Sequence, residues 1–234
     1  MKRKQSPTRL IKTVLIFGAA VIMLIAVSCK KDKPTKASTP PEPVTDIDNN
    51  TYKTVKIGTQ VWMAENLKTT KYQNGEAIEN KATAAKWMEA TAGYCDPKPF
   101  LPEYGKLYNG YAVTDPRNIA PKGWRVPTND DFVTLIEYLT TNANNDIKVV
   151  SNQLRETGTK HWNPNDGASN TTGFTAFPSP IRYPNDFFEL ANKTVFLSSS
   201  SNQGDLVALF INPNIASYTL FSKTQGLAIR CIRE

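Results

Sequence analysis

Two short segments near the middle of the first hundred residues alternate between apolar and polar positions. They are residues 52–57 and 60–64, and a period of two is typical of strands with one buried face. Gly58-Thr59 between them suits a tight turn, so a β-hairpin is predicted. After residue 193 the chain again favours strands, in four runs separated by polar turn residues. The runs are 195–197, 206–211, 217–221 and 227–232.

The apolar spacing changes to that of a helix after Pro127. One face repeats at the i, i+3, i+4, i+7 positions, and its residues are Phe132, Leu135, Ile136 and Leu139. Thr128 is the expected N-cap and Asp131 the third helical residue, a short version of the capping box.

Weaker patterns complete the set of predicted elements. A second helical spacing runs through Ile147, Val150 and Leu154, and the alanine-rich segment 82–90 suits a short helix. Residues 104–113 have the character of a strand interrupted by glycines. Strands, one or two flanking helices and a strand-rich C-terminal half predict the α+β class. Residues 157–192 form a long segment with few periodic elements, and such loops carry function or are held by their own packing.

The first 28 residues have the layout of an export signal. A basic head precedes an uncharged, apolar stretch from Thr13 to Ser28. Cys29 directly after Ala26-Val27-Ser28 resembles the bacterial lipobox, in which the cysteine is lipidated and becomes the first residue of the mature protein. The alternative is a membrane-spanning anchor with an incidental cysteine, but a span needs roughly 20 apolar residues. We therefore expect a signal peptide (1–28), a lipidated tether (29–44) rich in lysine and proline, and one domain (45–234).

The positive charge of the chain belongs to the signal and the tether. The formal net charge is +7, and nine basic residues against two acidic ones in residues 1–44 account for all of it. The remaining domain is neutral and lacks the basic footprint of a nucleic-acid-binding protein. A membrane, reached through the lipid, is the expected partner.

The chain offers little machinery for catalysis or cofactor binding. It has a single histidine, His161, which is expected on the surface, so a metal site built on paired histidines is excluded. No glycine-rich phosphate loop occurs, and no cofactor is expected. Four residues with hard oxygen ligands lie in one loop and could hold calcium, although local turns satisfied by hydrogen bonds explain them better. They are Asn163, Asn165, Asp166 and Asn170.

Several blocks, taken in order, resemble the Fibrobacter succinogenes major paralogous domain. The first is residues 54–67, Thr-Val-Lys-Ile-Gly-Thr-Gln-Val-Trp-Met-Ala-Glu-Asn-Leu. The others are Tyr-Gly-Lys-Leu-Tyr-Asn (104–109), Gly-Trp-Arg-Val-Pro-Thr (123–128), Leu-Arg-Glu-Thr-Gly (154–158), His-Trp-Asn (161–163), Gly-Phe-Thr-Ala (173–176) and a terminal run at 226–233.

The resemblance implies an exported protein of the Bacteroidetes and Fibrobacter group with a C-type-lectin-like fold. In that fold the terminal strands pair in one sheet, with flanking helices and long loops. Family members often have a cysteine where this chain has Ala120, so the resemblance leaves Cys231 either to pair with Cys95 or to stay reduced. The cysteines and copper chemistry of formylglycine-generating enzymes are not matched, and that activity is not expected here.

The favoured hypothesis is a non-catalytic binding module for a glycan or a protein, held at the outer membrane on its periplasmic or surface-exposed side. The loops of the C-terminal half would supply the ligand contacts. The candidate residues are Tyr183, Asn185, Asp186, Phe187, Phe188, Asn202, Gln203, Asn212 and Asn214. Two alternatives are a structural or assembly lipoprotein without its own ligand, and a glycoside hydrolase whose two carboxylates meet only in space.

Overall fold

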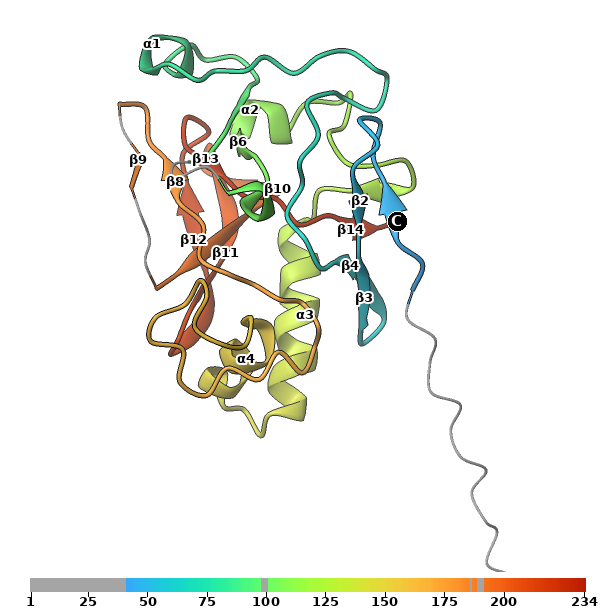
Figure 1. Cartoon of the computed structure of the whole chain (residues 1–234), viewed down its shortest axis with the longest axis vertical. Coiled ribbons are helices and arrows are strands. Elements are labelled where there is room, and N and C mark those ends of the chain that lie inside the picture. The colour runs from blue at the N-terminus through green and yellow to red at the C-terminus, as the bar shows by residue number, and fades with distance from the viewer. Residues whose placement is uncertain (1–40, 98–100, 186, 189–191) are drawn as a thin grey trace, which may run out of the picture. The chain divides into compact units, whose positions relative to one another are not determined.

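The terminal strands come together in a four-stranded antiparallel sheet ordered β3-β4-β14-β7. The computed structural model describes residues 41–234 except 98–100, 186 and 189–191, and only the backbone of Phe187 and Phe188 (Figure 1). The predicted hairpin forms from β3 (Thr54–Ile57) and β4 (Gln60–Met63), and Gly58 turns between them at a φ of 60°. The last strand, β14 (Ile232–Arg233), pairs with both β4 and β7 (Trp124–Arg125). The predicted pairing of terminal strands is confirmed.

A second, five-stranded sheet has the order β5-β6-β13-β8-β9. Its strands are short: β5 (Tyr94–Cys95), β6 (Leu107–Asn109), β13 (Gly226–Leu227), β8 (Ile181–Arg182) and β9 (Phe187–Phe188). The predicted run 227–232 therefore does not form one strand, because its two ends pair in different sheets. The segment 104–113 also divides, since Asn109 caps a short helix, α2 (Gly110–Val113), directly after β6.

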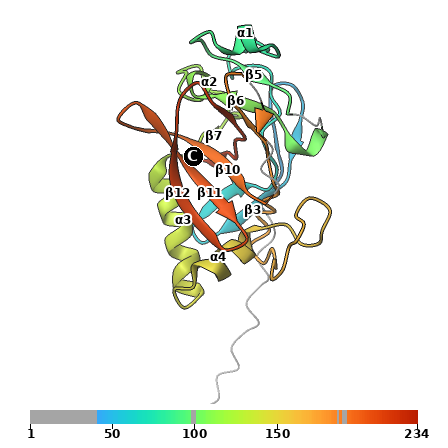
Figure 2. The ribbon, with the colours of Figure 1, turned by 90° about the vertical axis from the view of Figure 1, so that its left-hand side faces the viewer.

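Three long strands form the third sheet: β10 (Thr194–Asn202), β11 (Asp205–Asn212) and β12 (Ile215–Phe221). They lie side by side as an antiparallel meander (Figure 2). A fourth, two-stranded sheet joins β1 (Val44–Thr45) to β2 (Thr51–Tyr52).

The alternating side chains of the three-stranded sheet belong to two different hydrophobic clusters. Leu206 and Ala208 point into a cluster shared with Tyr108 and Trp124. Leu209 and Ile211, which alternate with them, join a cluster built on Phe132 and its helix neighbours. This separation follows from the period of two along a strand, and it explains why the predicted strands after residue 193 are so apolar.

The longest helix confirms its predicted start and buried face. Helix α3 spans Asn129–Asn142 and buries Phe132, Leu135, Ile136 and Leu139. The capping box forms, since the Thr128 hydroxyl accepts from the Asp131 N–H and the Asp131 carboxylate accepts from the Thr128 N–H at 2.6 Å. Arg125 on β7 also donates to both carboxylate oxygens of Asp131, at 2.5 and 2.8 Å, so the cap ties the helix to the terminal sheet.

The other predicted helices also form. Helix α4 (Ile147–Leu154) packs Val150 and Leu154 against the α3 cluster, but leaves Ile147 largely exposed. Helix α1 (Ala84–Trp87) is a single turn, and a 3₁₀ turn, η1 (Pro102–Tyr104), precedes β6. The α+β class is thus confirmed. Within the described residues, none of the helices has the length and apolar character needed to cross a membrane.

Of the two possibilities left open for Cys231, pairing with Cys95 is wrong: Cys95 and Cys231 are both buried thiols. Cys95 packs with Trp87 and Leu107 at the edge of the five-stranded sheet, whereas Cys231 lies in the large cluster beside the terminal sheet. A disulfide requires the two Cα atoms to lie within about 7 Å, and the two sheets hold these residues in separate clusters. Burial raises the pKa of the Cys231 thiol well above its ordinary value, so it stays protonated.

Candidate functional site

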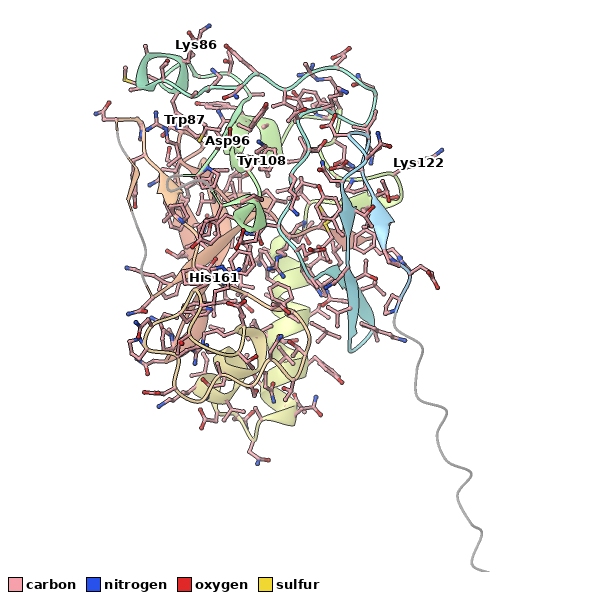
Figure 3. The ribbon with its side chains drawn as sticks, in the orientation of Figure 1. Lys86, Trp87, Asp96, Tyr108, Lys122 and His161 are labelled. Carbon is pink, nitrogen blue, oxygen red and sulfur yellow. The ribbon has the colours of Figure 1, made fainter. Side chains whose placement is uncertain are left out.

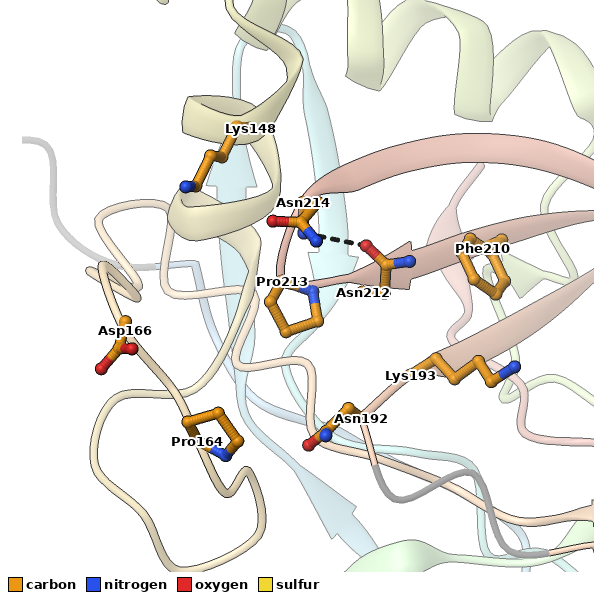
Figure 4. Close-up of a pocket in the computed structure, with 9 residues that line it drawn as sticks. All are labelled: Lys148, Pro164, Asp166, Asn192, Lys193, Phe210, Asn212, Pro213 and Asn214. Carbon is orange, nitrogen blue, oxygen red and sulfur yellow. Dashed lines mark hydrogen bonds between the residues drawn. The ribbon is translucent and has the colours of Figure 1, made fainter.

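An open pocket of about 540 Å³ lies at the end of the three-stranded sheet where β11 turns into β12. We call it the Asn212 pocket. Its lining comes from four parts of the chain: Lys148; Pro164 and Asp166; Asn192 and Lys193; and Phe210, Asn212, Pro213 and Asn214. Phe210 and Lys193 stand on one side, Pro164 and Asp166 on the other, and the Asn212–Asn214 turn between them (Figure 4). A volume of this size suits a small organic ligand or a few sugar units.

The β11–β12 turn is held rigidly by its first asparagine. The Asn212 side-chain oxygen accepts from the N–H groups of Asn214 and Ile215, at 2.8 and 3.0 Å. The Ser151 hydroxyl on α4 donates to the Asn212 carbonyl, which fastens the turn to the helix. Two of the predicted ligand residues, Asn212 and Asn214, thus share one rigid wall of the pocket.

The opposite wall is a loop organised around a buried arginine. Arg155 has no exposed surface, and it donates to the side chains of Asn152 and Asn165 and to the carbonyl of Asp166. The Asn165 amide in turn donates to the carbonyls of Glu156 and Gly158, at 2.7 and 2.6 Å. The loop is therefore held by internal hydrogen bonds.

The same contacts decide between the two interpretations of the asparagine-rich loop. The Asn170 side chain accepts from the Thr175 N–H and donates to the Thr175 hydroxyl, and Asn165 is engaged as described. These amides satisfy the local backbone, as the turn interpretation predicted. Within the part of the chain that the structure describes, no three His, Cys, Asp or Glu side chains are grouped so as to hold a metal ion.

Several polar groups around the Asn212 pocket have no partner within the described part of the chain. The ammonium groups of Lys148 and Lys193 and the side-chain amide of Asn214 make no hydrogen bond or ion pair there. Lys193 is half-buried, which makes the lack of an acidic partner more costly for it than for a surface lysine. These groups are available to a ligand.

The remaining predicted ligand residues do not join this pocket. Asn202 and Gln203 are exposed on the β10–β11 turn, where Gln203 and Gly204 have φ values of 53° and 96°. That turn lies at the far end of the eight-residue β11, roughly 25 Å from Asn212 at about 3.3 Å per residue.

The segment after β8 contributes less than predicted. Tyr183 is half-buried and packs against the large hydrophobic cluster, and Asn185 is exposed. Asp186 lies outside the described residues, and so do the side chains of Phe187 and Phe188. The backbone of Phe187 and Phe188 forms β9, which pairs with Ile181 and Arg182. The predicted role of the two phenylalanine rings stays a prediction.

His161 is not on the surface, contrary to the expectation. Its side chain, labelled in Figure 3, is only 5% exposed and lies between the rings of Tyr104 and Phe177, with centroids 5.7 and 5.0 Å away. Its Nδ1 is 2.7 Å from Glu156 and its Nε2 is 3.3 Å from Glu103. With its ring nitrogens facing Glu156 and Glu103, His161 joins the η1 turn to the long loop.

The electrostatics of the carboxyl groups do not favour acid catalysis. The ammonium of Lys160 lowers the pKa of Glu103 to about 2, with His161 adding to the effect. The guanidinium of Arg117 lowers the pKa of Asp115 to about 2. A carboxyl group that protonates a glycosidic oxygen needs a raised pKa. Among the carboxyl groups of the described residues, those with a shifted pKa are all lowered.

Sequence reasoning missed Lys148, Lys193 and Phe210 as site residues. Lys148 belongs to a helical pattern, and Lys193 and Phe210 belong to strand patterns, so each resembles an ordinary surface or core residue. One local signal was present: the polar Asn-Pro-Asn turn at 212–214 lies between two apolar runs. It pointed to the turn but not to the side chains that face it.

The comparisons with known proteins give one match. The sequence model of the Fibrobacter succinogenes major domain matches residues 55–233. None of the curated proteins and none of the solved structures matches the chain.

Proposed function

We propose that this chain, which belongs to the Fibrobacter succinogenes major domain family, is a lipid-anchored envelope protein that binds a glycan in the Asn212 pocket without turning it over. The observation that carries the proposal is the pocket itself. Amide and charged side chains from three loops and from α4 lie around the Phe210 ring in this pocket. Polar groups beside an apolar surface are what a sugar, with its hydroxyls and its C–H faces, requires.

The C-type-lectin-like arrangement is part of the same proposal. Pairing of β14 with β4, the flanking helices and the long loop between α4 and β8 support it. In such an arrangement a rigid scaffold presents loops for recognition. The two walls of the Asn212 pocket fit this description, because the turn is fixed by Asn212 and the loop by Arg155.

Glycan binding is favoured over the two alternatives by specific contacts. A hydrolase would need a carboxyl group of raised pKa and a second carboxylate near the ligand, and Asp166 is the one carboxylate among the described residues that line the pocket. A purely structural lipoprotein would not need a pocket whose lysines and amide lack internal partners.

The binding test uses the full-length protein in detergent micelles on a glycan array. The Asn214→Ala and Phe210→Ala variants are compared with Asn202→Ala, a matched control on the turn at the other end of the sheet. We expect the first two variants to lose most of the glycan signal and the control to keep it. Equal glycan binding by all three variants would show that the glycan site lies outside the Asn212 pocket. No glycan binding, together with capture of an envelope protein, would support the alternative of a protein ligand.

The anchor is tested separately by metabolic labelling with palmitate. The sequence predicts label on the wild-type protein and none on Cys29→Ala, with residues 1–28 missing from the mature form. Label on the variant, or retention of residues 1–28, would favour the membrane-spanning alternative instead.

A further inference from the structure

Among the described residues, the lining of the Asn212 pocket has an unbalanced positive charge. The charged members are Lys148, Lys193 and Asp166. Asp166 already interacts with the buried guanidinium of Arg155. Burial lowers the pKa of Arg155, and the negative charge of Asp166 raises it again in part. The Arg155 guanidinium also donates to the Asp166 carbonyl at 3.1 Å. The two ammonium groups have no such partner among the described residues.

The acidic residue nearest in sequence to Lys148 is also engaged. Asp146 caps α4, and its carboxylate accepts from the N–H groups of Lys148 and Val149, at 2.9 and 3.3 Å. Asp146 is not part of the pocket lining. The charge of Lys148 therefore remains available on the side of the pocket formed by α4.

We infer that the ligand of the Asn212 pocket is an acidic glycan, one whose sugar units bear carboxylate or sulfate groups. This inference rests on the proposed function and specifies its ligand class. Lys193 is a half-buried residue, and burying a charged side chain without an acidic partner is costly, so an anionic ligand group beside its ammonium is stabilising. A neutral sugar would leave the Lys193 ammonium without an acidic partner.

The arrangement of the side chains suggests how such a ligand lies. Lys193 extends beside the Phe210 ring (Figure 4), so a sugar packed on the ring brings an acidic substituent near the ammonium. The Asn212 and Asn214 amides occupy the middle of the pocket and suit hydroxyl groups. Lys148 stands beyond this turn, on α4, where it meets a second acidic unit of the chain.

The experiment measures binding of the full-length protein to three polymers by affinity electrophoresis and calorimetry. Polygalacturonate supplies carboxylates, its fully methyl-esterified form supplies the same backbone without charge, and dextran sulfate supplies sulfates. We expect Lys193→Gln to weaken binding to the preferred acidic polymer about tenfold, and Lys148→Gln two- to fivefold because it is more exposed. Lys56→Gln, an exposed lysine on β3, is the matched control and should not change the affinity.

The outcomes separate this inference from the proposed function. Preference for either acidic polymer, lost in Lys193→Gln and weakened by salt, supports it, and the polymer preferred identifies the acidic group. Equal affinity for the esterified polymer, with binding lost in Phe210→Ala but not in Lys193→Gln, overturns the inference and keeps the glycan site. An acidic polymer that binds all lysine variants and Lys56→Gln alike would also overturn it. Failure of every glycan, on the array as well, overturns the proposed function.

Discussion

Two polar regions of this protein differ in one respect. Around Arg230 the polar groups have hydrogen-bond partners within the protein, whereas at the Asn212 pocket the ammonium groups of Lys148 and Lys193 have none among the described residues. The Arg230 side chain is fully buried and donates to Asn66, at 2.7 Å, and to the carbonyls of Phe174 and Thr175. Burial lowers its pKa to about 9, so it is still a cation at neutral pH. The lysines of the pocket have no equivalent acceptors.

The difference distinguishes stability from recognition. Arg230, in the segment between β13 and β14, is bonded to the segment after β4 and to the long loop. It also lies 4.8 Å from the Phe174 ring. A buried charge is tolerated only where hydrogen bonds replace water. At the pocket, water still fills that role, and a ligand can displace it. Substitutions at Arg230 should therefore change the free energy of unfolding strongly, and substitutions in the Asn212 pocket should change it little.

The largest effect is expected where a charge is forced into the core without partners. Leu135→Asp places a carboxylate on the buried face of α3, and the cost should exceed the total stability of about 5–15 kcal/mol or consume most of it. Circular dichroism and urea unfolding check this. Thr134→Asp puts the same charge on the exposed neighbouring position of the helix and should fold normally. A cooperatively melting Leu135→Asp protein would show that α3 buries another face.

Removing the Arg230 cation is the next largest change. Arg230→Met leaves the Asn66 oxygen and two buried carbonyls without donors, and each such group costs about 1–3 kcal/mol. Urea unfolding should show a loss of about 3 kcal/mol or more. Arg233→Met is the control, because exposed Arg233 only stacks over Trp124 at 5.4 Å and should cost less than about 1 kcal/mol. Equal losses in the free energy of unfolding for Arg230→Met and Arg233→Met would contradict the contrast between a buried cation with hydrogen-bond acceptors and an exposed cation.

The capping box gives an intermediate, pH-dependent effect. Burial alone would raise the pKa of Asp131, but hydrogen bonds from Arg125 and Thr128 outweigh it and lower the pKa below 3.8. The ionised group therefore stabilises the fold at pH values above its ordinary pKa, and this contribution is lost as the pH falls through the lowered folded-state pKa.

Asp131→Asn removes that contribution. At pH 7 we expect a loss of about 1 kcal/mol in the free energy of unfolding, and below pH 3 the difference from wild type should shrink. Asp130→Asn, at the adjacent helix position without the Arg125 contact, is the control. A difference between Asp131→Asn and wild type that stays constant from pH 7 to pH 2 would exclude the ionised cap as its cause.

The smallest effect on stability is expected in the pocket. The double variant Lys148→Gln/Lys193→Gln should change the free energy of unfolding by no more than about 0.5 kcal/mol, since neither ammonium has an internal partner. Thermal unfolding by calorimetry checks this. A loss of 2 kcal/mol would mean that these lysines stabilise the fold and that the pocket charge is not reserved for a ligand.

The sequence by itself determined the elements whose causes are local. The start of α3 follows from Thr128 and Asp131 three residues apart, and the buried face follows from the 3.6-residue period. The β3–β4 hairpin follows from alternation around Gly58. Each of these depends on residues within one or two turns of each other, so their spacing in sequence is their spacing in space.

Only the tertiary structure decided which distant side chains meet. It brought Lys148, Asp166, Lys193 and Asn212 to one pocket, and it buried His161 between Glu103 and Glu156. It also separated Cys95 from Cys231 and sent the two ends of the 227–232 run into different sheets. Such contacts depend on how sheets and helices pack, and packing is set by the burial of whole faces. A lysine on a strand or an isolated histidine has no local pattern that reveals its neighbours.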